Sequence, residues 1–167
     1  MILIPHLVIG AVIAVKIPYW PLAIVLAFLS HYFLDFFPHI EYSIDNIRQR
    51  RWRKIKPDIF KLTLDLIIGL ILIFSIQQLT NINPLLILAT AFFAILPDIL
   101  IILLLIFPKN VILQKNFYIH QKVHLLNNNP PSSFAKLRTT EGQRKISNGW
   151  RVLTQIAFVI LGFAFIL

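Results

Sequence analysis

Long apolar segments constrain this chain more than any other feature of its sequence. Five can be marked, at residues 2–15, 19–37, 59–79, 84–107 and 150–167. A membrane-spanning helix needs about 20 apolar residues, because the hydrocarbon core is about 30 Å thick. The second, third and fourth segments reach that length, and the fifth is marginal. The first is short, and fits a short span, a re-entrant element or a helix packed inside a bundle.

Composition agrees with a membrane protein of one domain. Of the 167 residues, 57% are hydrophobic and 14% are charged, whereas soluble proteins are about 45–50% apolar. Backbone polar groups in lipid must bond within their own segment, so the segments should be helices. The expected fold is therefore all-α: an integral membrane helical bundle of about five membrane segments, over residues 1–167. No cysteine is present, which excludes disulfides and thiolate metal ligands.

The basic residues predict the orientation of this bundle. Most Lys and Arg residues fall in two loops, 38–58 and 108–149. The connection between the first and second segments has only Lys16, and the connection between the third and fourth has none. Under the positive-inside rule both basic loops are cytoplasmic, in an inner or plasma membrane. The net charge of +9 then predicts contact with anionic lipid headgroups and not with nucleic acid. The second loop should contain an interfacial helix at about 111–126, followed by a linker at 127–133.

Histidines and aspartates gather toward this same face. His31 and Asp35 are four residues apart near the end of the second segment, so they share a helix face. Asp98 lies about 14 Å from the end of the fourth segment at 1.5 Å per residue. His120 and His124 repeat the spacing of four on the interfacial helix. The topology brings His39 and Asp65 to this face as well, and also His6 if the first segment spans the membrane.

This gathering predicts a metal site. A buried charge in lipid costs at least about 2.5–3.5 kcal/mol, and so marks a functional position. Imidazole and carboxylate ligands favour zinc, with manganese or iron as alternatives when carboxylates are more numerous. The candidate ligands are His6, His31, Asp35, His39, Asp65, Asp98, His120 and His124. Asp65 and Asp98 are also the candidates for a catalytic carboxylate.

Some of these residues have structural interpretations as well. Asp65 follows Lys61 by one helical turn and could pair with it. Asp58 follows Pro57 at the start of the third segment, where an N-cap is expected. Pro97 should kink the fourth segment and free a carbonyl group, which is tolerated only inside a bundle or beside a wet cavity. Asp98 should therefore face inward.

Four short motifs resemble those of the prokaryotic membrane-bound metal-dependent hydrolases. Residues 30–35 (SHYFLD) resemble their S-H-x-x-L-D motif, and residues 95–99 (ILPDI) resemble their L-P-D-I-D motif. The His120/His124 pair resembles their H-x-x-x-H, and His6 with Gly10 resembles their H-x-x-x-G. Leu100 replaces the second Asp of L-P-D-I-D. The family is compared with helical, zinc-dependent phospholipase C, so the resemblance implies a metal-dependent hydrolase.

Three functions therefore remain open. The first is a hydrolase at the cytoplasmic interface, in which a metal activates water against a phosphoester or another ester, with a small-molecule or lipid-borne substrate. The second is a metal-ion or proton transporter that uses the same histidines and aspartates. That function requires polar residues to continue to the outer face, and the second and fourth segments offer little beyond Thr90. The third is a non-enzymatic membrane interaction protein whose polar cluster only fixes the bundle.

Overall fold

The computed structural model describes residues 3–37, 39, 45–48, 51–126 and 148–166. All elements in these residues are helical, as expected for an all-α fold. They are α1 (Ile4–Lys16), α2 (Trp20–Asp35), α3 (Asp45–Arg48), the 3₁₀ turn η1 (Trp52–Lys54), α4 (Lys56–Thr80), α5 (Pro84–Ile106), α6 (Val111–Leu126) and α7 (Asn148–Ile166). The linker expected at 127–133 lies outside the described residues.

Three of these helices are long and apolar enough to cross a membrane: α4, α5 and α7. The outward faces of these helices carry large apolar side chains, including Phe60, Ile71, Phe74, Leu85 and Phe165, each more than half exposed. Such faces are stable against lipid, whereas in water they would be aggregation-prone. Helices α1 and α2 have only 13 and 16 residues. About five membrane segments were expected, and three helices meet the length requirement.

Prolines and asparagines set the helix ends. Pro5, Pro21, Pro57 and Pro84 each lie in the first two positions of a helix, where the missing N–H costs nothing. The α4–α5 connection is short, since Asn81 ends α4 with a left-handed φ of 52°. Asn83 then caps α5 by accepting a hydrogen bond from the backbone N–H of Leu85 at 2.9 Å. The two long helices therefore form an antiparallel hairpin.

Helix α1 lies at the centre of the bundle, where it packs against α2, α4, α5 and α7. Its residues Leu7, Val8, Ala11 and Ala14 are buried in the apolar core. Gly10 permits the close approach of α5, because a Cβ atom there would lie 2.9 Å from the Cα atom of Ala91. Of the interpretations left open for the first segment, the structure shows a short helix packed inside the bundle.

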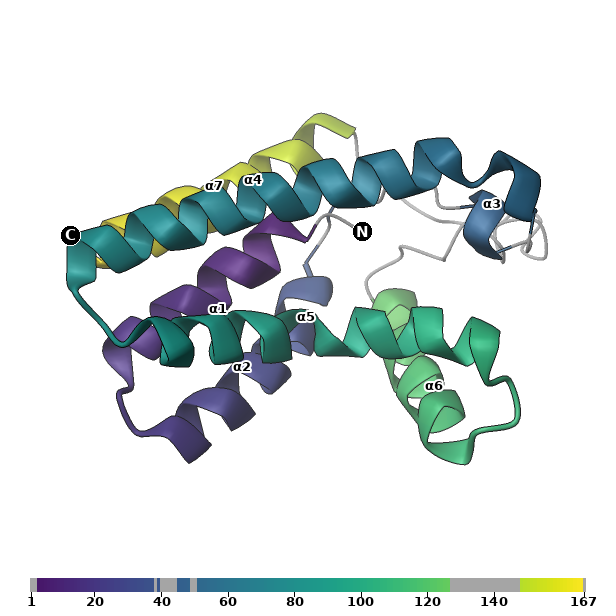
Figure 1. Ribbon diagram of the computed structural model, residues 1–167, viewed down its shortest axis with the longest axis horizontal. Helices are drawn as coiled ribbons and strands as arrows, with labels where there is room; N and C mark the ends of the chain where they lie inside the picture. The colour runs from purple at the N-terminus through teal and green to yellow at the C-terminus, as the bar shows by residue number, and fades with distance from the viewer. Residues whose placement is uncertain (1–2, 38, 40–44, 49–50, 127–147, 167) are drawn as a thin grey trace.

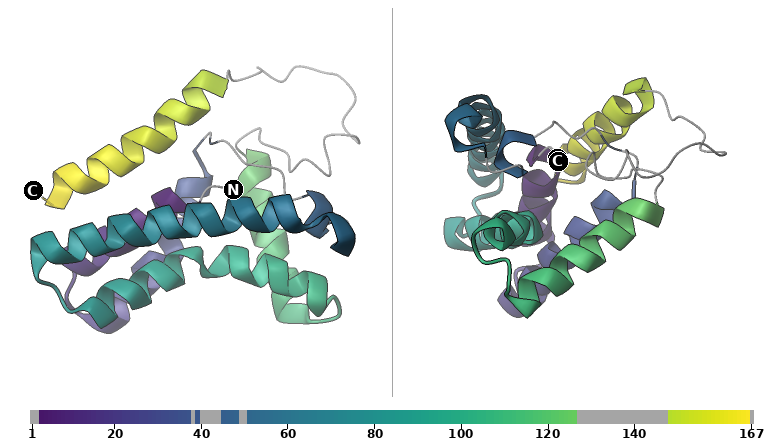
Figure 2. Two further views of the ribbon diagram at one scale, coloured as in Figure 1. Left: turned by 45° about the horizontal axis from the view of Figure 1, so that its top comes forward. Right: turned by 90° about the vertical axis from the view of Figure 1, so that its right-hand side faces the viewer.

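The two ends of the bundle differ (Figure 1). The α1–α2 and α4–α5 loops lie at one end together with the end of α7, while α3 and α6 lie at the other. Helix α6 crosses the bundle there at a steep angle to the long helices and packs against α5 and α2 (Figure 2). Its bounds agree with the helix expected at 111–126. The described parts of the two basic loops, which include α3, η1 and α6, therefore lie at the same end of α4 and α5.

The expected N-cap role of Asp58 is wrong. Helix α4 begins at Lys56 after the cap residue Ile55, so Asp58 lies inside its first turn. The buried carboxylate instead accepts hydrogen bonds from the backbone N–H groups of Asn46 at 2.9 Å and Ile47 at 3.2 Å. Asp58 therefore holds α3 against the start of α4. The position of Asp58 after Pro57 does not indicate in the sequence that its carboxylate binds the backbone of Asn46, 12 residues earlier.

Candidate metal centre

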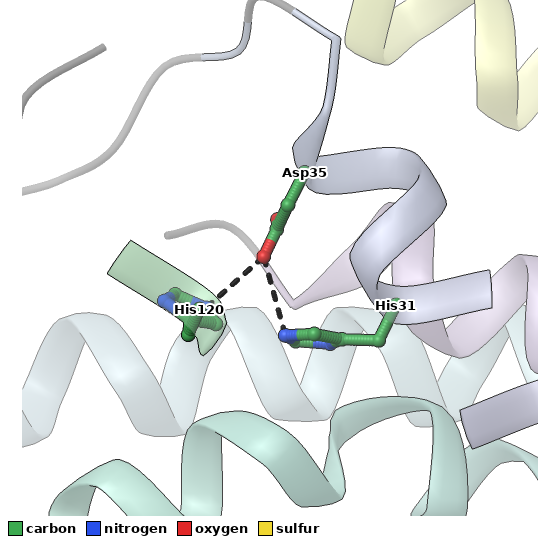
Figure 3. Close-up of side chains that lie close together, drawn as sticks. All are labelled: His31, Asp35 and His120. Atoms are coloured by element: carbon green, nitrogen blue, oxygen red, sulfur yellow. Dashed lines mark ion pairs between the residues drawn. The ribbon is translucent and has the colours of Figure 1, made fainter. Parts of the chain in front are cut away.

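The carboxylate of Asp35, the last residue of α2, lies between histidines from two helices (Figure 3). Its Oδ2 atom is 3.3 Å from Nε2 of His31, one turn earlier on α2, and 3.0 Å from Nε2 of His120 on α6. One ligand atom from each of these three buried residues lies within 4.8 Å of the other two. The spacing of four predicted that His31 and Asp35 would share a face, and the fold adds His120.

Asp98 on α5 joins the same group. Its Oδ1 atom is 3.5 Å from Nε2 of His31 and 3.3 Å from Nε2 of His120. The Asp98 side chain is only 13% exposed. Three helices, α2, α5 and α6, therefore contribute two imidazoles and two carboxylates to one small volume.

The spacing of these atoms fits a bound ion. Two ligand atoms on a tetrahedral zinc ion, at bonds of 2.0–2.2 Å, lie about 3.3–3.6 Å apart. The four nitrogen–oxygen distances in the group run from 3.0 to 3.5 Å. An ion at the centre could therefore reach both imidazoles and a carboxylate with little movement.

The orientation of His31 is fixed by a backbone carbonyl. Its Nδ1 atom lies 2.8 Å from the carbonyl oxygen of Ala94 on α5. A carbonyl only accepts, so Nδ1 must carry a proton, and Nε2 is the ring nitrogen that faces the carboxylates. This Nε2 atom is buried without a hydrogen-bond partner among the described residues. A histidine that binds a metal typically donates its other ring N–H to a carbonyl or carboxylate, and the Ala94 carbonyl takes that role for His31.

Pro97 lies inside α5, as expected, and the helix continues through it. A proline within a helix bends it and disrupts the hydrogen bonds of the preceding turn. Ala94, which binds His31, lies in that turn. The Pro97 carbonyl accepts a second side-chain hydrogen bond, from Nδ2 of Asn116 at 3.0 Å. Pro97 therefore lies where side chains of α2 and α6 form hydrogen bonds with backbone carbonyls of α5.

Asn116 and Tyr32 were not among the sequence candidates, and they support the centre from outside. The Tyr32 hydroxyl on α2 donates to Oδ1 of Asn116 at 2.7 Å. Since Asn116 also bonds Pro97, it connects α2, α5 and α6 one turn before His120. The only sequence signal was this spacing of four from Asn116 to His120, which places both on one face of α6.

Two further histidines lie on the other side of Asp35. Nε2 of His6, near the start of α1, is 3.5 Å from Oδ1 of Asp35, and Nε2 of His39 is 3.8 Å from the same atom. The Nδ1 atom of His39 lies 2.8 Å from the carbonyl oxygen of Phe37, which again directs its Nε2 lone pair inward. His6 and His39 are both buried. The expected convergence of these histidines is therefore found.

The electrostatics of His120 reflect two negative neighbours. Burial by itself disfavours the imidazolium ion, but the carboxylates of Asp35 and Asp98 outweigh it and raise the pKa of His120 to about 9. Without a metal the imidazole is therefore protonated at neutral pH. The centre favours positive charge, whether a proton or a metal ion supplies it.

Among the described residues, the candidate Asp65 does not join the group of His31, Asp35 and His120. The Asp65 carboxylate on α4 accepts a hydrogen bond from the backbone N–H of Leu3, directly before α1. It thereby holds the start of α1, which carries His6. His124 lies one turn after His120 on α6, and its side chain is outside the described residues.

No family model, curated protein or solved structure matches this chain. The resemblance of its motifs to the membrane-bound metal-dependent hydrolases therefore remains an expectation from the sequence.

Proposed function

We propose that this chain is a membrane-embedded metal-dependent hydrolase, with one divalent cation held by His31, Asp35 and His120 and with Asp98 beside it. The observation that carries the proposal is the convergence of two Nε2 and two carboxylate oxygen atoms from three helices, at distances of 3.0–3.5 Å. Two imidazoles with two carboxylates favour zinc, and manganese or iron would also suit the oxygen ligands.

The reaction that fits this centre is the hydrolysis of an ester. A bound zinc ion lowers the pKa of a coordinated water to about 7 and polarises the group under attack. Asp98 is suited to take the proton of that water, because Oδ1 faces the two histidines while Oδ2 is buried without a hydrogen-bond partner among the described residues. Asp65, bonded to Leu3, has a positioning role for α1 in this proposal.

The location of the centre favours a substrate from the membrane or its cytoplasmic interface. Exposed cations at Arg51, Arg53 and Lys54 precede α4, and exposed Lys56 is its first residue, at the end of the bundle where α3 and α6 lie. The positive-inside rule makes this end cytoplasmic. Asp98 is eight residues before the end of α5, or about 12 Å along the helix. A phosphoester or other ester on a lipid would reach that depth, and the basic residues would attract anionic headgroups.

Transport has less support. A permeation path would continue from the centre toward the opposite end, but the buried residues there are largely apolar, including Leu7, Ala11, Ile87 and Ala91. The buried Thr90 hydroxyl donates to backbone carbonyls of its own helix, at 3.0 Å to Leu86 and Ile87. Among the described residues this core gives a cation no continuous set of ligands.

Metal analysis of the purified protein tests the proposal. We expect wild type in detergent to contain a stoichiometric transition metal by mass spectrometry, and to hydrolyse a chromogenic phosphoester only when the metal is present. His31→Ala and His120→Ala should lose both properties. Lys115→Ala, at an exposed position on α6, is the matched control and should retain them. A wild type without metal, or variants that match it in metal content, would overturn the proposal.

A further inference from the structure

Each of the two oxygen atoms of the Asp35 carboxylate faces a pair of histidines. Its Oδ2 atom faces His31 and His120, at 3.3 and 3.0 Å. Its Oδ1 atom faces His6 and His39, at 3.5 and 3.8 Å. His31 and His39 each lie four residues from Asp35 in the chain, whereas the fold brings His120 to Oδ2 and His6 to Oδ1.

We infer that this carboxylate bridges two divalent cations. The second cation is held by Oδ1 of Asp35 with the Nε2 atoms of His6 and His39. This inference rests on the proposed function, which supplies the first cation on Oδ2. Bridged pairs of metal ions about 3.5–4 Å apart are common in enzymes that hydrolyse phosphoesters, where the pair stabilises the attacking and the leaving oxygen.

The chemistry of the two histidines fits a metal ligand. The Phe37 carbonyl accepts from Nδ1 of His39, so the lone pair on Nε2 points toward Asp35. His6 is 4% exposed, and its Nε2 atom is directed at the same oxygen. The His6 ring also lies 4.5 Å from the ring of His31, centroid to centroid. Two imidazoles and a shared carboxylate oxygen make three protein ligands, the number typical of a catalytic zinc site.

The fourth position of the second cation would face a pocket. His6 and His39 both line this pocket, together with the apolar side chains of Pro5, Leu34 and Phe37. Helix α7 closes the opposite wall with three residues, Thr154, Gln155 and Phe158. The second cation would therefore be placed to hold water or a substrate oxygen at this position.

The walls of the pocket are mostly apolar, and the Phe37 and Phe158 rings pack edge to face with centroids 5.2 Å apart. The Thr154 hydroxyl on the α7 wall donates a hydrogen bond to the backbone carbonyl of Arg151 at 3.0 Å. The enclosed space has room for about one water molecule, which is the ligand expected at the open position of the second cation.

Metal stoichiometry and electron paramagnetic resonance test the second cation. We expect metal-free protein to bind two Mn²⁺ or Zn²⁺ ions per chain, and the Mn²⁺ form to show the exchange-coupled spectrum of a bridged pair. His39→Ala should bind one ion and show an uncoupled Mn²⁺ spectrum. His120→Ala should lose the first ion, and Lys115→Ala should match wild type.

The outcomes separate this inference from the proposed function. Wild type that binds one ion, with an uncoupled spectrum, overturns the second cation and leaves the hydrolase proposal standing. Wild type that binds none overturns both. The spectrum of wild type requires no substitution, so the test does not depend on whether the His39→Ala variant folds.

Discussion

His120 is the residue whose charge the centre controls most directly. Its imidazole lies 3.0 Å from an oxygen of Asp35 and 3.3 Å from an oxygen of Asp98. The raised pKa means that a proton must leave His120 before its Nε2 atom can bind a metal. Proton release and metal binding are therefore linked at this one ring.

This linkage predicts how metal binding depends on pH. Below a pKa of about 9, the apparent affinity should fall about tenfold for each pH unit, because one proton competes with the metal at His120. The stability of the metal-free protein should change in the opposite sense. The raised pKa contributes stability that is fully present below pH 6.5 and is lost as the pH rises through about 9.

Calorimetric titration in two buffers of different ionisation enthalpy measures this proton. At neutral pH the difference in heat should correspond to about one proton released per first metal ion bound. An affinity that stays constant from pH 6 to pH 8 would contradict the assignment of His120 as a ligand.

The residues of the centre were largely predictable because ionisable groups are conspicuous in apolar segments. His31, Asp35, Asp98 and His120 were all identified from depth and spacing. Asp65 was grouped with them because depth along a helix does not determine which neighbour the helix face meets. The supporting residues Tyr32 and Asn116 are neutral and carry no comparable desolvation cost, so nothing in the sequence distinguished them from ordinary polar residues.

At the scale of elements, α6 depends on Asn116 for its position. This side chain is 7% exposed and bonds both α2 and α5. Removal of this side chain leaves the Pro97 carbonyl and the Tyr32 hydroxyl without their hydrogen-bond partner. The loss should lower the free energy of unfolding by about 1–3 kcal/mol. The position of His120, one turn later, should change as a result.

The Asn116→Ala substitution should therefore weaken metal binding without the loss of a ligand. We expect a decrease in affinity of about tenfold and a lower melting temperature in detergent, measured by titration and by circular dichroism. Tyr32→Phe, which removes only one of the two hydrogen bonds, should have a smaller effect of the same sign. A variant of Asn116 with wild-type affinity would show that α6 is held by other contacts.

Helix bounds were predicted well where composition changes sharply, and less well where apolar residues continue past the helix end. The helix at 111–126 and the start of α5 at Pro84 agree with expectation. The second segment was expected to reach residue 37, but α2 ends at Asp35. Phe36 and Phe37 are apolar and yet lie beyond the helix, where Phe37 lines the pocket. Hydropathy does not distinguish a residue that covers a site from one that faces lipid.

The orientation of the whole molecule in the membrane can be tested in cells. Exposed Gln78 lies near the end of α4, and exposed Lys54 lies in η1 just before the start of α4. Because the chain has no cysteine, single cysteines at these positions report directly on orientation. The basic end should be cytoplasmic.

Labelling with a membrane-impermeant maleimide provides the measurement. Gln78→Cys should react in intact cells, and Lys54→Cys should react only after the cells are lysed. The wild-type chain, which cannot react, is the control. The reverse pattern would place the centre on the outer side of the membrane and remove the cytoplasmic substrate from the proposal.

The central position of α1 has a consequence for biogenesis. This helix precedes its neighbours α4, α5 and α7 in the chain, so it is synthesised before the partners that bury it. His6 and Asp35 are likewise synthesised before Asp98 on α5 and His120 on α6. If the proposed metal site exists, a ribosome-bound chain that stops before α6 would lack the His120 ligand, and metal loading would be a late event.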